Sequence, residues 1–115
     1  METILEELNQ LPEVLGSLII GKDGLVIVSS WETELDMDAV GAMSADIFGV
    51  AESLMEEKLQ KGGVKFFGIE SENAGFFFKT IDESTFLAVA ASPAVNMGLL
   101  RIEITAAAAK LREVL

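Results

Sequence analysis

The sequence predicts an α/β (α+β) domain in which one five-stranded antiparallel sheet is covered by helices on both faces. Five short runs are rich in apolar and β-branched residues, short Gly-, Asn- or Asp-containing turns separate most of them, and three segments carry apolar residues at helical spacing. The predicted order is αββαβββα. Because the strands are apolar at nearly every position, both faces of the sheet must be buried. We expect the long middle helix on one face and the two terminal helices on the other.

The first half of the chain predicts a helix followed by a hairpin. Residues 2–11 place apolar side chains on one helical stripe, and Pro12 ends the pattern. Strands are expected at 16–21 and 24–30, on either side of an Asp-Gly turn in which Gly24 is free to adopt a positive φ.

The second half predicts a long helix, a three-stranded meander and a closing helix. The long helix is expected at 37–61, with Asp36 as its N-cap and Gly62-Gly63 at its end. The last helix follows Pro93. The three strands of the meander are expected at 64–71, 75–81 and 85–92.

The closing helix carries two apolar stripes rather than one. Leu100 and Ile104 belong to the first, while Leu99 and Ile102 belong to a second about 150° away around the helix. We therefore expect this helix to be wedged between the sheet and the first helix.

Composition limits the class of protein. The 115 residues (1–115) are expected to form a single domain, with 19 acidic residues against 8 basic ones, a net charge of −11, no cysteine and no histidine. Disulfides, common zinc sites and imidazole catalysis are therefore excluded. The negative charge disfavours nucleic acid and anionic lipid as partners. With neither a secretory signal nor a membrane span in its sequence, we expect a cytoplasmic protein.

No catalytic, cofactor or metal motif is found. The glycine-rich phosphate-binding patterns are absent, and serine has no histidine as a base. Adjacent carboxylates such as Asp36 and Asp38 fall at helix ends, helix surfaces or turns, and they lack the further oxygen ligands of a calcium loop. We expect a protein that is not an enzyme and has no cofactor.

Two segments resemble the roadblock / dynein light chain family. They are the hairpin at 16–30 (GSLIIGKDGLVIVSS) and the stretch at 95–101 (VNMGLLR), which follows the last strand. The resemblance extends over nearly the whole chain and implies a profilin-like fold with the strand order 2-1-5-4-3. Trp31 and the acidic loop after it have no place in that pattern, so they are assigned no family role.

The middle helix has a wider apolar arc than one sheet face requires. Its centre stripe, expected to pack on the sheet, is Val40, Met43, Ile47, Ala51 and Leu54. The flanking apolar residues either curl onto the sheet edges or meet the same helix of a second copy, and we prefer the second interpretation. The implied strand order also leaves the apolar strand at 64–71 on an open edge, which self-pairing would cover. The expected interface residues are Met37, Phe48, Met55, Val64, Phe66, Phe67 and Ile69.

The resemblance implies a homodimeric interaction platform, of the bacterial or archaeal gliding-regulator kind, that binds and regulates or localises a Ras-like small GTPase. Asp38, Glu52 and Glu56, on the exposed side of the paired middle helices, are the expected partner-binding residues. The alternative is a profilin- or PAS-like sensory domain with a small molecule between sheet and helix. The sequence leaves open whether the second copy is the same chain or a related one, and whether the GTPase is activated or only recruited.

Overall fold

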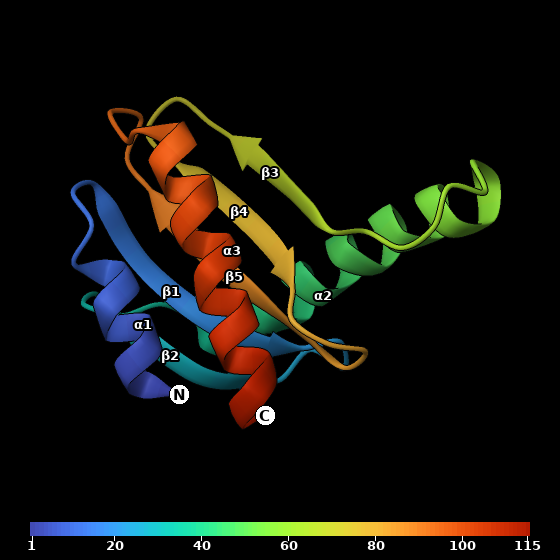
Figure 1. Ribbon diagram of the computed structural model, residues 1–115, viewed down its shortest axis with the longest axis horizontal. Coiled ribbons are helices and arrows are strands. Elements are labelled where there is room, and N and C mark those ends of the chain that lie inside the picture. The colour runs from blue at the N-terminus through green and yellow to red at the C-terminus, as the bar shows by residue number, and fades with distance from the viewer.

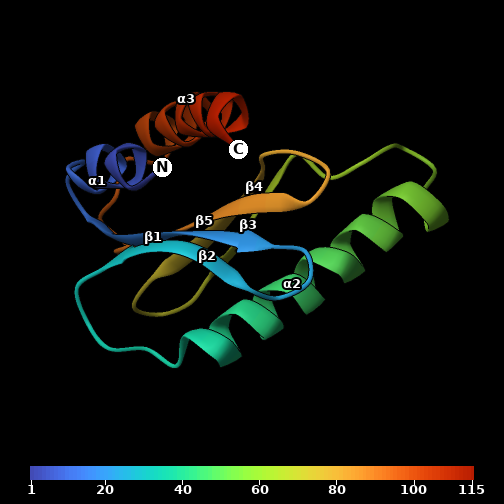
Figure 2. The same cartoon turned by 90° about the horizontal axis from the view of Figure 1, so that it is seen from below.

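A computed structural model describes all residues, 1–115, and shows three layers. One sheet lies between a single long helix on one face and two helices on the other (Figures 1 and 2), as predicted. The elements are α1 (Glu2–Asn9), β1 (Val14–Gly21), β2 (Val26–Trp31), α2 (Met37–Ser53), the helical turn η1 (Leu54–Lys58), β3 (Phe66–Glu70), β4 (Gly75–Thr80), β5 (Thr85–Ala91) and α3 (Met97–Val114).

The sheet is antiparallel throughout and has the order β2-β1-β5-β4-β3. The predicted fold class and strand order are therefore confirmed. Gly24 turns the first hairpin with φ 95°. The central strand β5 is buried along its whole length, and β2 and β3 form the two edges.

Two separate cores fill the two faces. Alternate residues of the strands point to opposite sides, so neighbours such as Phe77 and Phe78 belong to different cores. The larger core lies under α1 and α3 and includes Leu5, Leu100 and Ile104. The smaller core lies under α2 and combines the rings of Phe48, Phe78 and Phe86 with Leu18 and Ile20 of β1 and Ala88 of β5.

The middle helix ends earlier than the sequence pattern predicts. Regular α-helix stops at Ser53, and one π-helical turn follows, in which the amide of Leu59 donates to the carbonyl of Leu54 at 2.9 Å. The chain then reverses through Gln60 and Gly62, which have φ values of 55° and 92°. The predicted cap is confirmed, since Asp36 Oδ1 accepts a hydrogen bond from the amide of Ala39 at 3.1 Å.

The expected second buried face of α3 is wrong. Leu99 and Ile102 are 42% and 66% exposed, whereas Leu100 and Ile104 on the opposite side are fully buried on the sheet. The first helix packs beside α3 and against β1 and β2, so it does not cover this stripe. An apolar stripe by itself identifies a surface to be buried, and it does not identify which neighbour will bury it.

A polar network fixes α1 to the sheet. Ser17 is completely buried on β1 and donates from Oγ to Asn9 Oδ1 at 2.8 Å. Asn9 in turn donates from Nδ2 to both the carbonyl and the hydroxyl oxygen of Ser30 at 2.8 Å. One side chain at the end of α1 therefore joins β1 and β2.

Candidate interaction surface

The orientation of α2 on the sheet is set by Gly41, Ser44 and Phe48, the three buried residues of the helix. Their spacing of three and four residues puts them on one face. Phe48 is 1% exposed and is surrounded by the rings of Phe67 and Phe86. Phe48 therefore lies in the core of its own chain, and its expected position in a dimer interface is wrong.

Gly41 permits this close packing. A Cβ atom at this position would collide with the carbonyl oxygen of Gly24, in the turn between β1 and β2. The helix can approach the hairpin only because no side chain intervenes. This small-residue face could have been recognised in the sequence, because the small residues Gly41 and Ser44 share it with one large aromatic side chain.

As a consequence, α2 turns an apolar stripe to the outside. The expectation that Met43, Ile47 and Leu54 pack on the sheet is wrong, because Phe48 and its small neighbours take that place. Sequence reasoning also missed Val50, which belongs to the same stripe. The exposed fractions are 64% for Met43, 39% for Ile47, 71% for Val50 and 50% for Leu54.

The second half of α2 projects beyond the sheet (Figures 1 and 2). A cavity of about 490 Å³ opens between this projecting part and the start of β3. Its apolar lining residues are Ala51, Leu54, Met55, Val64, Phe66 and Phe67. An isolated chain leaves this apolar space open to solvent, which is unfavourable unless another surface fills it.

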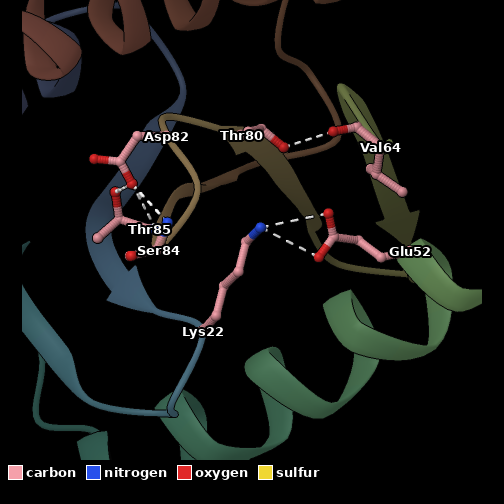
Figure 3. Close-up of polar contacts among 7 residues, drawn as sticks. All are labelled: Lys22, Glu52, Val64, Thr80, Asp82, Ser84 and Thr85. Carbon is pink, nitrogen blue, oxygen red and sulfur yellow. Dashed lines mark hydrogen bonds and ion pairs between the residues drawn. The ribbon is translucent and has the colours of Figure 1, made fainter. Parts of the chain in front are cut away.

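The edge strand β3 borders the same cavity. Four residues of the expected interface, Met55, Val64, Phe66 and Phe67, line the cavity and are half-buried. Ile69 is 43% exposed, while Met37 packs against the core under α2. The hydroxyl of Thr80 donates to the carbonyl of Val64 at 2.6 Å and anchors the segment that leads into β3 (Figure 3).

The three acidic residues expected to bind a partner lie on the flank of α2 away from the apolar stripe. Asp38 and Glu56 are exposed. Glu52 is partly buried and forms an ion pair with Lys22 at 3.2 Å, joining α2 to the first hairpin (Figure 3). Glu52 therefore has a contact within its own chain, and only the other two carboxylates are free.

Trp31 has a structural position that the sequence did not predict. It ends β2, one residue beyond the strand expected at 24–30, and its ring occupies the space above Gly16, where a Cβ atom would collide with it. Its Nε1 donates to Thr33 Oγ1 at 2.8 Å. Beside it, an apolar cavity of about 250 Å³ extends to Leu35 and Phe76.

The chain has neither a cluster of metal ligands nor a membrane-spanning helix. No group of three or more carboxylates is arranged to hold a metal ion. None of the helices has both the length and the apolar character needed to cross a bilayer.

Sequence comparison identifies the family. The model of the Roadblock/LC7 domain family matches residues 1–91. An uncharacterized protein of Methanocaldococcus jannaschii is 37% identical over 112 residues, which are 97% of this chain and 93% of that protein. Another uncharacterized protein of the same organism is 36% identical, over 97% of this chain and 96% of its own length. The chain belongs to the Roadblock/LC7 domain family, as the resemblance indicated.

Solved structures share the fold at low sequence identity. A Roadblock/LC7 domain from Streptomyces avermitilis has a TM-score of 0.91 and 19% identity, covering 99% of this chain and 96% of its own. MglB of Myxococcus xanthus has a TM-score of 0.89 and 16% identity, with coverages of 97% and 91%. Profilin II of Acanthamoeba castellanii has a TM-score of 0.63 and 19% identity, with coverages of 97% and 93%, which confirms the profilin-like architecture.

Proposed function

We propose that this protein is a regulatory interaction domain that forms a homodimer and binds a Ras-like small GTPase. Membership of the Roadblock/LC7 family and the fold shared with MglB support a protein-interaction role. The observation that carries the dimer is the exposed stripe of α2, in which Val50 is 71% exposed, beside the open edge of β3. Leu54 belongs both to the stripe and to the lining of the cavity at β3, so the two apolar surfaces meet at this residue.

A second copy covers this surface best. Two-fold symmetry places the same stripe on both sides of the contact, so apolar residues meet apolar residues. Pairing of the two β3 edges also satisfies backbone groups that otherwise face solvent at an apolar edge. A stable interface buries about 1,200–2,000 Å² in total. We expect a contact that includes both the α2 stripe and β3 to reach that size.

Sedimentation equilibrium tests the dimer. We expect the unaltered protein to be a dimer at micromolar concentration and Val50→Glu to be a folded monomer, because a carboxylate would be buried without a partner. Ser53→Glu, also exposed on α2 but outside the stripe, is the matched control and should remain dimeric. An unaltered protein that sediments as a monomer would exclude this proposal.

The GTPase is the partner that the family resemblance implies. In the dimer, the two α2 helices form one surface, and Asp38 and Glu56 on its acidic flanks are free to pair with basic residues of the partner. Glu52 is already paired with Lys22, so it contributes less. Pull-down from the native lysate with GTP or GDP, followed by identification of the retained proteins, tests this step. Retention of no GTPase in either nucleotide state would contradict it.

The sensory alternative has less support. Phe48, Phe78 and Phe86 fill the space between α2 and the sheet, and no buried side-chain polar atom lacks a partner. A ligand site requires a few converging polar groups that fix the ligand. Native mass spectrometry separates the two functions, since a dimer without added mass favours the platform and a co-purified small molecule favours the sensor.

A further inference from the structure

Four of the eight basic residues gather beside one strand edge of this acidic chain. They are Lys65, Lys79, Arg101 and Arg112, which we call the basic cluster. The two ion pairs of the protein, Lys22–Glu52 and Lys110–Glu7, lie elsewhere. Burial, followed by the positive charges of Lys65, Arg101 and Arg112, lowers the pKa of the Lys79 ammonium. The cluster therefore lacks a compensating negative charge.

Two members of the cluster, Lys79 and Arg101, lie beside Phe66 at the start of β3. Lys79 is paired with Phe66 across the β3–β4 ladder, so both side chains lie on the sheet face that carries α3. The guanidinium of Arg101 lies 4.6 Å from the ring centroid of Phe66. Arg112 donates from Nε to the carbonyl of Ile81 at 2.7 Å, further along the same side of α3. Figure 1 shows that α3 leaves β3 itself uncovered.

Glu70, at the other end of β3, is the acidic residue that suits this cluster. Residues 66, 68 and 70 alternate onto the same sheet face. Glu70 also lines a hollow with Phe77 and Met97, which places it on the α3 side. Glu70 lies roughly 13 Å along the strand from Phe66, the residue that the guanidinium of Arg101 contacts in its own chain. It forms no ion pair there.

The backbone of β3 is arranged for self-pairing. The carbonyl of Lys65 accepts from the amide of Thr80 at 3.2 Å, so residue 65 turns its backbone groups inward to β4. By alternation, Phe66, Gly68 and Glu70 present their amides and carbonyls to the open side. When two such edges pair antiparallel about a two-fold axis at Gly68, Phe66 of each copy lies directly opposite Glu70 of the other.

We propose that β3 pairs with β3 of a second copy in this register and that Glu70 of the second copy completes the basic cluster by contacting Arg101 and Lys79. The inference rests on the proposed homodimer and adds to it a specific alignment. A register with Phe66 opposite Phe66 would bring the two basic clusters together without a carboxylate between them, and like charges so placed repel. Charge complementarity therefore favours the alignment centred on Gly68 over the one with Phe66 opposite Phe66.

Charge reversal tests the contact. We expect Glu70→Arg and Arg101→Glu each to weaken dimerisation about tenfold or more in sedimentation equilibrium, and the double variant to recover most of the loss. Glu6→Arg, an exposed change on α1, which packs over β1 and β2 and away from β3, is the matched control and should leave the dimer intact. Thermal melts followed by circular dichroism show whether each variant is folded.

Cysteine cross-linking tests the register independently, because the chain has no cysteine of its own. Facing residues of a hydrogen-bonded pair have Cα atoms about 5.5 Å apart, within disulfide range. We expect Phe66→Cys combined with Glu70→Cys to form a covalent dimer on oxidation, and Phe66→Cys alone to form none. The inference would be overturned if Phe66→Cys alone formed a covalent dimer. It would also be overturned if the double charge reversal recovered none of the dimerisation lost in the single variants. Either result would leave the proposed homodimer standing. A monomeric unaltered protein would exclude both.

Discussion

The ring of Phe48 on α2 stacks on the ring of Phe86 on β5, with centroids 4.5 Å apart and an angle of 11° between the planes. This contact joins the helix to the central strand of the sheet. It also determines the rest of the helix surface, because a helix that turns Phe48 inward must turn Val50 and Leu54 outward. The Phe48–Phe86 contact and the exposed apolar stripe thus both follow from the orientation of α2 about its own axis.

Removal of the Phe48 ring should therefore affect folding rather than association alone. We expect Phe48→Ala to lower the free energy of unfolding by about 3–5 kcal/mol, because it leaves a cavity between α2 and the sheet. Urea denaturation followed by circular dichroism measures the loss. Ile47→Ala, a neighbouring change on the exposed stripe, should cost much less. Equal losses for the two variants would contradict the orientation of α2 described above.

The fold was predictable from the sequence because its signals are local. The Asp-Gly turn, the Asp36 cap and the apolar runs each depend on neighbours in the chain, and all three agree with the structure. The order of the strands depends on contacts between distant segments, and it came from the family resemblance rather than from the pattern.

The rotation of α2 was not predictable in the same way. Its apolar residues surround most of the helix, so periodicity selects no single inner face. The close contact of Gly41 with the Gly24 turn decides the matter, and it involves segments that are far apart in the sequence. Val64, Phe66 and Phe67 are only partly covered in the single chain, because an edge strand has one free side, and their place in a dimer interface stays a prediction.

Two glycines of α2 should respond to alanine in opposite directions. Alanine is favoured over glycine by about 1 kcal/mol within a helix. At Gly49 nothing lies within 4 Å of the added Cβ, so we expect Gly49→Ala to raise the free energy of unfolding. At Gly41 the new atom would meet the Gly24 carbonyl, so we expect Gly41→Ala to lower it. Thermal unfolding of the two variants provides the comparison, and a stabilised Gly41→Ala protein would contradict the close packing.

Removal of the Asn9 side chain should lower the free energy of unfolding, because Asn9 joins α1 to β1 and β2. Asn9→Ala removes the acceptor of the buried Ser17 hydroxyl and both bonds to Ser30, leaving only a long contact of 3.5 Å from Ser17 to the carbonyl of Leu5. We expect a loss of about 1–3 kcal/mol in urea denaturation. Gln10→Ala, an exposed neighbour, is the control. The double change Asn9→Ala with Ser17→Ala should cost less than the sum of the single changes, because it no longer leaves the buried Ser17 hydroxyl without its acceptor.

Asp82 lies in the turn between β4 and β5, and its hydrogen bonds should make the free energy of unfolding depend on pH. The Thr85 hydroxyl donates to Asp82 Oδ1 at 2.8 Å, and the amides of Ser84 and Thr85 donate at 2.8 and 2.9 Å (Figure 3). The bond from the Thr85 hydroxyl contributes most to lowering the pKa of this carboxyl; the two amides and Lys22 add to the effect, and burial opposes it. The pKa in the folded protein is thus below that of the unfolded chain, which is about 3.9.

Because the unfolded chain binds a proton more readily, the stabilisation by Asp82 is fully present above about pH 4 and is lost as the pH falls through the lower folded pKa. We expect Asp82→Asn to be less stable than the unaltered protein at pH 7, with a difference that narrows below pH 4. Urea denaturation between pH 2 and 7 measures this difference. Glu83→Gln, an exposed change in the same turn, should show no such convergence. A difference for Asp82→Asn that stays constant over the whole range would mean that the hydrogen bonds do not favour the charged carboxylate.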